Sequence, residues 1–198
     1  MRSGTMTIIA VLGLVLALAT GAAAQKRKEP KMERNVPPSA SAERARFAVA
    51  REVRHELLMM PYYGVFDWIQ YEVQPDGTVV LDGKVTRPTI KSRAEKAAAD
   101  VEGVTRVQNR IDVLPPSGID DQLRLRLYRE IYSGPLFRYQ VGSLNTIHII
   151  VDHGHVTLEG QVNSSGDRTI AYARANSVPG IFSVTNNLQV VNGRDDNE

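Results

Sequence analysis

The stretch GTVVLDGKVTRPTIKSRAEKAAADVEGVTRVQNRIDV, residues 77–113, is repeated in similar form 77 residues later as GHVTLEGQVNSSGDRTIAYARANSVPGIFSVTNNLQV, residues 154–190. The two segments align without a gap. Glycine opens turns and a period of two marks half-buried strands, so matched glycines and matched apolar positions indicate two copies of one structural unit. The matched pairs include Gly77 and Gly154, Leu81 and Leu158, Gly83 and Gly160, Val85 and Val162, and Gly103 and Gly180.

Hydrophobic periodicity and turn residues predict the elements of the first copy. Apolar residues recur at spacings of three and four before Pro61, which indicates a helix that ends there. Segments in which apolar and polar residues alternate flank Asp76 and Gly77, two residue types that favour a hairpin turn. The predicted elements are a helix over 42–60, strands over 66–74 and 78–86, a helix over 88–102 and a strand over 104–113.

The second copy repeats this order after an insertion at 139–145. Its predicted elements are a helix over 119–132, strands over 146–151 and 155–162, a helix over 165–178 and a strand over 181–191. A helix between the second and third strands makes those strands parallel, whereas the hairpin strands are antiparallel. The predicted fold class is therefore α+β, with two tandem αββαβ domains that each form a three-stranded mixed sheet packed by helices. Units of about 70 residues bury a core only marginally, which favours packing of the two copies on each other.

The repeated pattern resembles the BON family, named for bacterial osmotically induced periplasmic and nodulation proteins. The hairpins DGTVVLDGKV (76–85) and HGHVTLEGQV (153–162) carry the resemblance, with an alanine-containing helix after each. The segments VEGVTRVQNRIDV (101–113) and VPGIFSVTNNLQV (178–190) complete it. The resemblance implies a small binding protein of the cell envelope with two tandem BON domains, which acts in envelope maintenance or protection from osmotic stress. It also implies that a small cation could be bound by backbone oxygens, as in some relatives.

Residues 1–24 are predicted to be a secretory signal peptide. Arg2 gives the N-terminus a positive charge, an apolar segment follows, and the three alanines that end at Ala24 form a small-residue cleavage site. An uncleaved anchor is the alternative, but the apolar run is short of the roughly 20 residues that cross a bilayer. We therefore expect a periplasmic protein. The expected divisions are a disordered basic linker over 25–42, domains over 43–114 and 118–192, and a disordered tail over 193–198.

Composition and motifs exclude several classes of function. The chain has no cysteine, so disulfides, thiol catalysis and lipidation of an N-terminal cysteine are excluded. Its formal net charge of +2 is too balanced for a nucleic-acid binder. Neither a phosphate loop nor a nucleophile elbow is present, so we predict no enzyme activity and no cofactor. Asp152, His153 and His155 could ligate zinc, but a hairpin turn explains them without a ligand, and no metal site is predicted.

The helix over 119–132 carries two apolar stripes on a helical wheel. Leu123, Leu127 and Ile131 form a stripe that suffices to cover a three-stranded sheet. Leu125, Tyr128 and Tyr132 form a second stripe, which Arg126 and Arg129 border. An interfacial lipid contact requires this combination, because the rings enter the headgroup zone while the guanidinium groups bind phosphate. The predicted lipid-binding residues are Leu125, Arg126, Tyr128, Arg129 and Tyr132. The alternative is that the second stripe packs against the first copy.

Aromatic residues also follow the first helix of each copy. Tyr62 and Tyr63 in MMPYYGVFDW (59–68), and Leu136 and Phe137 in SGPLFRY (133–139), lie in predicted loops. Such loops can insert into a bilayer or hold an unfolded apolar chain, or they can close the ends of the two cores. Trp68 is expected to be a core residue of a strand.

These features predict a non-enzymatic periplasmic protein that binds anionic phospholipid at a membrane face. The alternative is a soluble periplasmic holdase that shields unfolded exported proteins through the aromatic loops and has no lipid preference. The basic linker is a further candidate for contact with anionic lipid.

Overall fold

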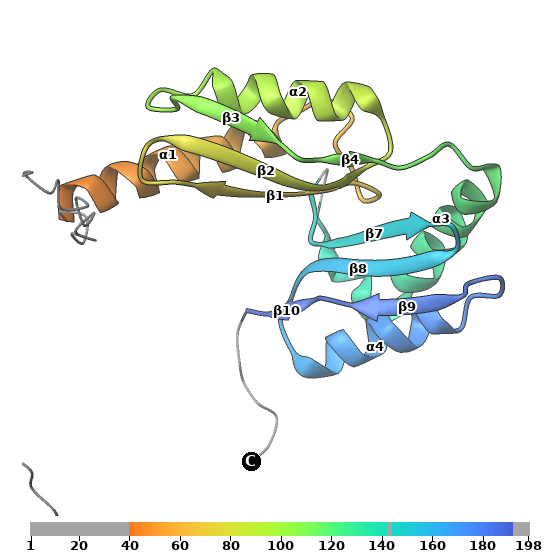
Figure 1. The fold of residues 1–198 in the computed structure, drawn as a ribbon. Coiled ribbons are helices and arrows are strands. Elements are labelled where there is room, and N and C mark those ends of the chain that lie inside the picture. Colours follow the sequence, from red (N-terminus) through yellow and green to blue (C-terminus); the bar gives the residue numbers. More distant parts are fainter. Residues whose placement is uncertain (1–39, 142–143, 192–198) are drawn as a thin grey trace, which may run out of the picture. The chain divides into compact units, whose positions relative to one another are not determined.

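The computed structural model describes residues 40–141 and 144–191 (Figure 1). The predicted signal peptide with its cleavage site after Ala24, most of the linker and the C-terminal tail lie outside the described residues. The first helix begins at Ala40. Residues 40–42, which were expected to end the disordered linker, are therefore helical.

The predicted order of elements is confirmed in both copies. The first domain contains α1 (Ala40–Leu58), β1 (Trp68–Val73), β2 (Thr78–Val85), α2 (Pro88–Ala99), β3 (Arg106–Asn109) and β4 (Asp112–Val113). The second contains α3 (Gly118–Ile131), the 3-10 helix η1 (Gly134–Tyr139), β5 (Gln140–Val141), β6 (Leu144–Asn145), β7 (Ile147–Asp152), β8 (His155–Val162), α4 (Ser165–Asn176), β9 (Ser183–Asn186) and β10 (Gln189–Val190). The insertion before β7 contains the short β5–β6 hairpin.

Each sheet has the predicted mixed topology. Strand β2 lies in the centre of the first sheet, antiparallel to β1 and parallel to β3 and β4. Strand β8 occupies the same place in the second sheet, antiparallel to β7 and parallel to β9 and β10. The third strand of each sheet thus consists of two short pieces in line, where the sequence predicted one continuous strand.

Two repeated asparagines explain this interruption. Asn109 Nδ2 donates to the carbonyl of Lys91 in α2 (3.0 Å), while its Oδ1 accepts from the N–H of Ile111 (3.2 Å). Asn186 makes the same two bonds, to the carbonyl of Arg168 in α4 (2.9 Å) and from the N–H of Leu188 (3.2 Å). Each side chain ties a helix to a strand and satisfies backbone groups at the break in the ladder.

The repeated glycines of β2 and β8 allow a close approach of backbone. Gly83 and Gly160 have φ values of +129° and +112°, which L side chains rarely adopt. A Cβ at Gly83 would overlap the carbonyl oxygen of Trp68, and one at Gly160 would overlap that of Thr146. The glycine shared by LDGKV and LEGQV is therefore required by the contact with Trp68 of β1 in the first domain and with Thr146, just before β7, in the second.

Each domain has its own hydrophobic core between its sheet and its helices. In the first domain, Val53 of α1 and Ala94 of α2 pack with sheet residues such as Leu81. The second core combines α3, α4 and the core face of β7 and β8, and it also includes Val65 from the loop between α1 and β1. The carbonyl of Val65 accepts a hydrogen bond from the N–H of Ile149 (2.7 Å), so this loop packs on the second sheet. Trp68 lies in β1 as predicted, but it belongs to neither core.

Within residues 40–141 and 144–191, no helix combines the length and the apolar character that a bilayer span requires.

Candidate functional site

Helix α3 is fixed on the second sheet by a cap and a buried stripe. Ser117 Oγ accepts the N–H of Asp120 (3.2 Å) at the N-terminus of the helix. Leu123, Leu127 and Ile131 are buried in the second core, so the first predicted stripe is confirmed. These contacts determine which side of α3 is left facing outward.

The second predicted stripe divides into three different environments. Leu125 is 51% exposed, while Tyr128 is half-buried and its ring meets Phe66 edge-on, with 6.2 Å between centroids. Tyr132 is only 4% exposed, and its hydroxyl donates to the carbonyl of Ile147 (2.5 Å). Burial raises the pKa of the Tyr132 phenol, so it remains a neutral donor. An outward position was wrong for Tyr132, which packs in the core of its own domain, and Tyr128 makes the contact with the first copy that the alternative expected.

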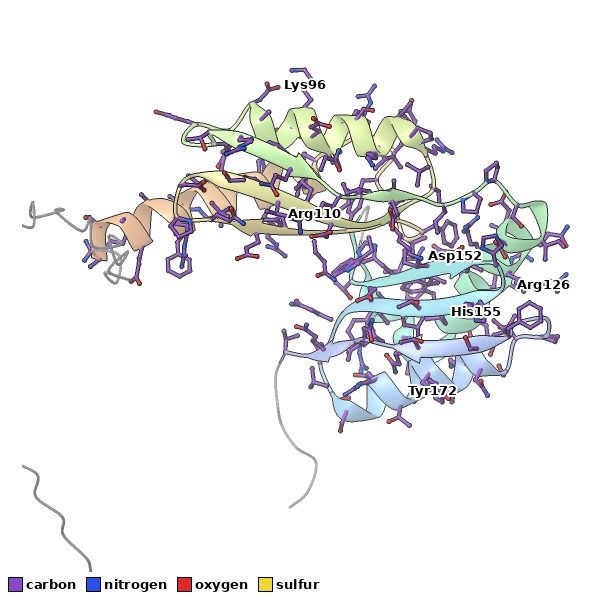
Figure 2. All side chains as sticks on the ribbon, viewed as in Figure 1. Lys96, Arg110, Arg126, Asp152, His155 and Tyr172 are labelled. Atoms are coloured by element: carbon purple, nitrogen blue, oxygen red, sulfur yellow. The ribbon has the colours of Figure 1, made fainter. Side chains whose placement is uncertain are left out.

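Two arginines remain exposed beside Leu125. Arg126 and Arg129 are both exposed, and Figure 2 shows Arg126 projecting from α3 away from the sheet. Neither guanidinium forms an ion pair with any residue in the described part of the chain. Arg124 differs, because it is buried and its guanidinium bonds to Asp121 (2.6 Å) and to the carbonyl of Val151 (2.6 Å). Arg126 and Arg129 are therefore free to bind an anion.

A further apolar pair lies at the N-terminal end of α3. Ile119 is 74% exposed and Phe182, in the loop between α4 and β9, is 79% exposed. The carboxylate of Asp120 accepts the N–H of Gly154 (2.9 Å), and the carbonyl of Gly154 accepts the N–H of Phe182 (2.9 Å). These bonds hold both apolar side chains at one end of the domain. We call Ile119, Leu125, Arg126, Arg129 and Phe182 the α3 surface.

Sequence reasoning missed Ile119 and Phe182, although the repeat contained a signal for Phe182. At an offset of 77 residues, Phe182 corresponds to Thr105 of the first copy. Thr105 Oγ1 donates to the carbonyl of Asp76 (2.9 Å), as expected of a turn residue. A phenylalanine at a position where the fold accepts a polar residue is not required for folding, and its exposed ring is available to a partner.

The residues of the two aromatic loops do not form one cluster. Tyr62 is 71% exposed, with the guanidinium of Arg87 5.8 Å from its ring centroid. Tyr63 is half-buried and its ring lies 5.7 Å from that of His148, while burial raises the pKa of its phenol. Leu136 is fully buried in the second core, and Phe137 is exposed. Tyr62 and Phe137 are thus accessible on different domains, and Leu136 is structural.

The acidic and histidine residues at the β7–β8 turn are engaged within the protein. Asp152 Oδ2 accepts from Lys84 Nζ (2.6 Å), and its other oxygen contacts His153 Nδ1 (2.7 Å). Hydrogen bonds from Lys84 are the main reason that the pKa of Asp152 is lowered. His155 Nδ1 contacts Ser183 Oγ (2.7 Å). Among the described residues, no group of three potential ligands is placed to hold a metal ion.

The repeat also matches a known family. The family model described as BON domain matches residues 47–115 and 120–192. Among solved structures, the chain is similar to CdsD, a structural protein of the type III secretion system of Chlamydia trachomatis, with 12% identity, 75% of this chain and 95% of that chain covered, and a TM-score of 0.29. For the C-terminal domain of CdsD, the values are 12% identity, 71% and 96% coverage and a TM-score of 0.25. No curated protein matches the sequence.

Proposed function

Because the chain belongs to the BON family and contains two BON domains in tandem, we propose that it binds anionic phospholipid through the α3 surface of its second domain. BON domains are linked to association with membranes and phospholipids and to stress, and proteins that carry them are generally non-enzymatic. We further propose that this chain acts by binding alone, in envelope maintenance or stress protection.

One observation carries the proposal: Arg126 and Arg129, which form no ion pair with any described residue, lie beside exposed Leu125, and two further exposed apolar side chains lie at the N-terminal end of the same helix. Arg126 and Arg129 can each donate several N–H bonds to phosphate oxygens, which are strong because both partners are charged. Leu125, Ile119 and Phe182 can enter the boundary between headgroups and acyl chains. An anionic surface satisfies both requirements at once, whereas a soluble anion would leave the apolar side chains in water.

Vesicle binding with a matched control tests this proposal. The variant Arg126→Gln/Arg129→Gln removes two charges, each worth about 1 kcal/mol near an anionic membrane, so affinity for phosphatidylglycerol vesicles should fall about 30-fold. The control Arg44→Gln/Arg51→Gln removes two exposed charges from α1 and should bind like the parent protein. Binding to phosphatidylcholine vesicles should be weak throughout, and binding should weaken as salt rises. Equal losses in the two variants would mean that net charge, not the α3 surface, drives binding.

A second function, the shielding of unfolded exported polypeptides, is favoured by exposed apolar residues of the first domain. Met59 is 67% exposed and Tyr62 is 71% exposed, only three positions apart. If the protein is a holdase, Met59→Ser/Tyr62→Ser should reduce its ability to suppress aggregation of a denatured test protein. That variant should leave vesicle binding unchanged, so the two functions can be separated.

The proposal places the mature protein in the periplasm, where BON proteins are typically found or are associated with membranes. Cleavage after Ala24 would leave Gln25 as the first residue. Mass spectrometry of the protein from a periplasmic extract measures this directly, and recovery of the chain with Met1 in the membrane fraction would contradict it.

A further inference from the structure

A cavity of about 530 Å³ lies apart from the α3 surface. Its walls come from the end of α1, the loop after it, β1, and residues of the second domain in and around β7 and β8. Its size falls in the range of about 300–1,000 Å³ that small-molecule sites occupy. None of the five residues of the α3 surface lines it.

Three residues in the cavity wall carry buried polar atoms without a hydrogen-bond partner. These atoms are Trp68 Nε1, Thr146 Oγ1 and His148 Nδ1, and the described residues contain only one other such atom, Arg124 Nε. An unsatisfied buried polar group is destabilising by about 1–3 kcal/mol, so native proteins contain few of them. Each of these atoms is shielded from solvent, so a molecule in the cavity would reach them after a small movement of the wall and would then satisfy all three.

The hydrogen-bonding character of these atoms defines that partner. The indole of Trp68 can only donate, while the Thr146 hydroxyl can donate and accept. His148 is 7% exposed, and burial lowers its pKa, so its ring is neutral at pH 7. Its Nδ1 has no hydrogen-bond partner, and in the neutral tautomer that carries the proton on Nε2 this atom is an acceptor. A donor beside an acceptor is the complement of a hydroxyl group.

The other lining residues favour a neutral ligand with several hydroxyl groups. Aromatic rings of Trp68, Tyr63 and Tyr71 provide flat apolar surfaces, and Gln70, Gln161 and Gln189 provide amides that donate and accept together. The charges of Arg54 and Glu159 are opposite, so the wall has no net preference for an ion. We propose that this cavity binds a sugar, either a free saccharide or a unit of a glycan chain.

The experiment uses Trp68, because it is the only tryptophan of the chain and its indole N–H gives one resolved NMR signal. The full mature protein is titrated with trehalose as a free saccharide and with N,N′-diacetylchitobiose as a unit of a glycan. The sugar that the cavity binds should shift the indole signal until the shift saturates, with a dissociation constant of about 1 mM or below. Sedimentation with insoluble peptidoglycan then distinguishes a glycan chain from a free sugar.

Thr146→Val removes one hydroxyl while keeping the shape of the side chain, and it should weaken sugar binding about tenfold. Thr185→Val, at an exposed position of β9, is the matched control and should bind like the parent protein. No shift of the indole signal with either sugar, or contacts of the indole N–H with water alone, would overturn the proposal. Vesicle binding should be unchanged in Thr146→Val, so the failure of either proposal is distinguishable from that of the other.

Discussion

Helices α1 and α3 open the two domains and bury stripes of the same spacing, but their outward arginines have different neighbours. Val53 and Leu57 of α1 are buried as Leu127 and Ile131 of α3 are. Outside, the guanidinium of Arg46 lies over the exposed ring of Phe47 on α1, 5.9 Å from its centroid. On α3, Arg126 and Arg129 lie beside exposed Leu125 and form no ion pair with any described residue. The repeated fold thus constrains the buried stripe, while the outward face is free to acquire a binding function.

The same contrast holds elsewhere in the repeat. Gly83 and Gly160 have the same role in both domains because backbone lies against each of them. By contrast, Ile90 in the first core corresponds to Asp167 in the second domain, at the offset of 77 residues. Asp167 is also buried, and it accepts hydrogen bonds from Arg138, Tyr139 and Ser164. The second domain therefore contains a charged network that the first domain replaces by an aliphatic side chain.

The largest expected effect is the loss of a framework glycine, and it should be similar in the two domains. Gly83→Ala and Gly160→Ala each add a Cβ that overlaps a carbonyl oxygen at a positive φ, so each should lower the free energy of unfolding by at least about 3 kcal/mol. Denaturant unfolding measures this. Gly118→Ala is the control, because no atom lies within 4 Å of the added Cβ, and its effect should be within about 1 kcal/mol. A tolerated alanine at one site alone would show that the two hairpins differ.

Acid should destabilise the second domain through Asp167. Burial raises the pKa of this carboxyl, but hydrogen bonds from Tyr139, Arg138 and Ser164 outweigh burial and hold the pKa below its usual value of 3.8. A carboxyl with a lowered pKa contributes stability above its unfolded pKa, and this contribution is lost as the pH falls through the folded pKa. Amide exchange at pH 3 and pH 6 should therefore show a larger loss of protection in α4 than in α2.

Asp167→Asn tests the assignment of this pH effect. The variant should lower stability at pH 6 by about 2 kcal/mol, because a charge-assisted network is weakened, and it should reduce the difference between pH 6 and pH 3. If the pH dependence of stability is unchanged in this variant, the acid sensitivity comes from another carboxyl, such as Asp152, whose pKa is also lowered.

An exchange of side chains between position 182 and its counterpart, position 105, tests whether the phenylalanine contributes to binding only on the second domain. Phe182→Thr should weaken binding to anionic vesicles about tenfold, because partial burial of one ring in the interface contributes about 1.4 kcal/mol. Stability should hardly change, since Phe182 is 79% exposed. Thr105→Phe adds the same ring to the first domain and should not increase vesicle affinity, because the adjacent turn carries the carboxylate of Asp76, which repels an anionic surface.

The smallest expected effect concerns the ion pair between Lys84 and Asp152. The pair is short, at 2.6 Å, but the side chains are 43% and 30% exposed. Exposed pairs contribute about 0–1 kcal/mol, so a double-mutant cycle with Lys84→Met and Asp152→Asn should give a coupling energy in that range, and high salt should reduce it. The counterpart of Lys84 in the second copy is Gln161, which cannot form this pair.

The sequence predicted the order of elements because periodicity and turn glycines are local features. It could not predict that the second hairpin turn is shorter. Val73 is the last residue of β1 to pair with β2, with Val79 as its partner, whereas Asp152 of β7 pairs with His155 across a shorter turn. A gapless alignment that begins at Gly77 and Gly154 does not include β1 and β7, so it cannot detect this difference in turn length. The register of β7 is consequently set by its own pairing, not by the repeat.

Part of the candidate site was also predictable. The helical wheel identified Leu125, Arg126 and Arg129 correctly as outward positions, but it misplaced Tyr132, which is the C-cap residue with φ −84° and ψ 6°. A wheel assumes regular helix geometry, and it cannot represent a hydroxyl that reaches a carbonyl of a neighbouring strand. The unpaired polar atoms around Trp68 depend on contacts between segments far apart in sequence, so no local pattern could indicate them.

Binding of anionic lipid at the α3 surface is measured directly by paramagnetic relaxation from spin-labelled lipid in phosphatidylglycerol bilayers, read from the amide signals of the mature protein. We expect the strongest broadening along the outward side of α3, at Leu125, Arg126 and Arg129, and at Phe182, with α1 unaffected. Strongest broadening on α1 or around Tyr62, or equal broadening in both domains, would contradict it.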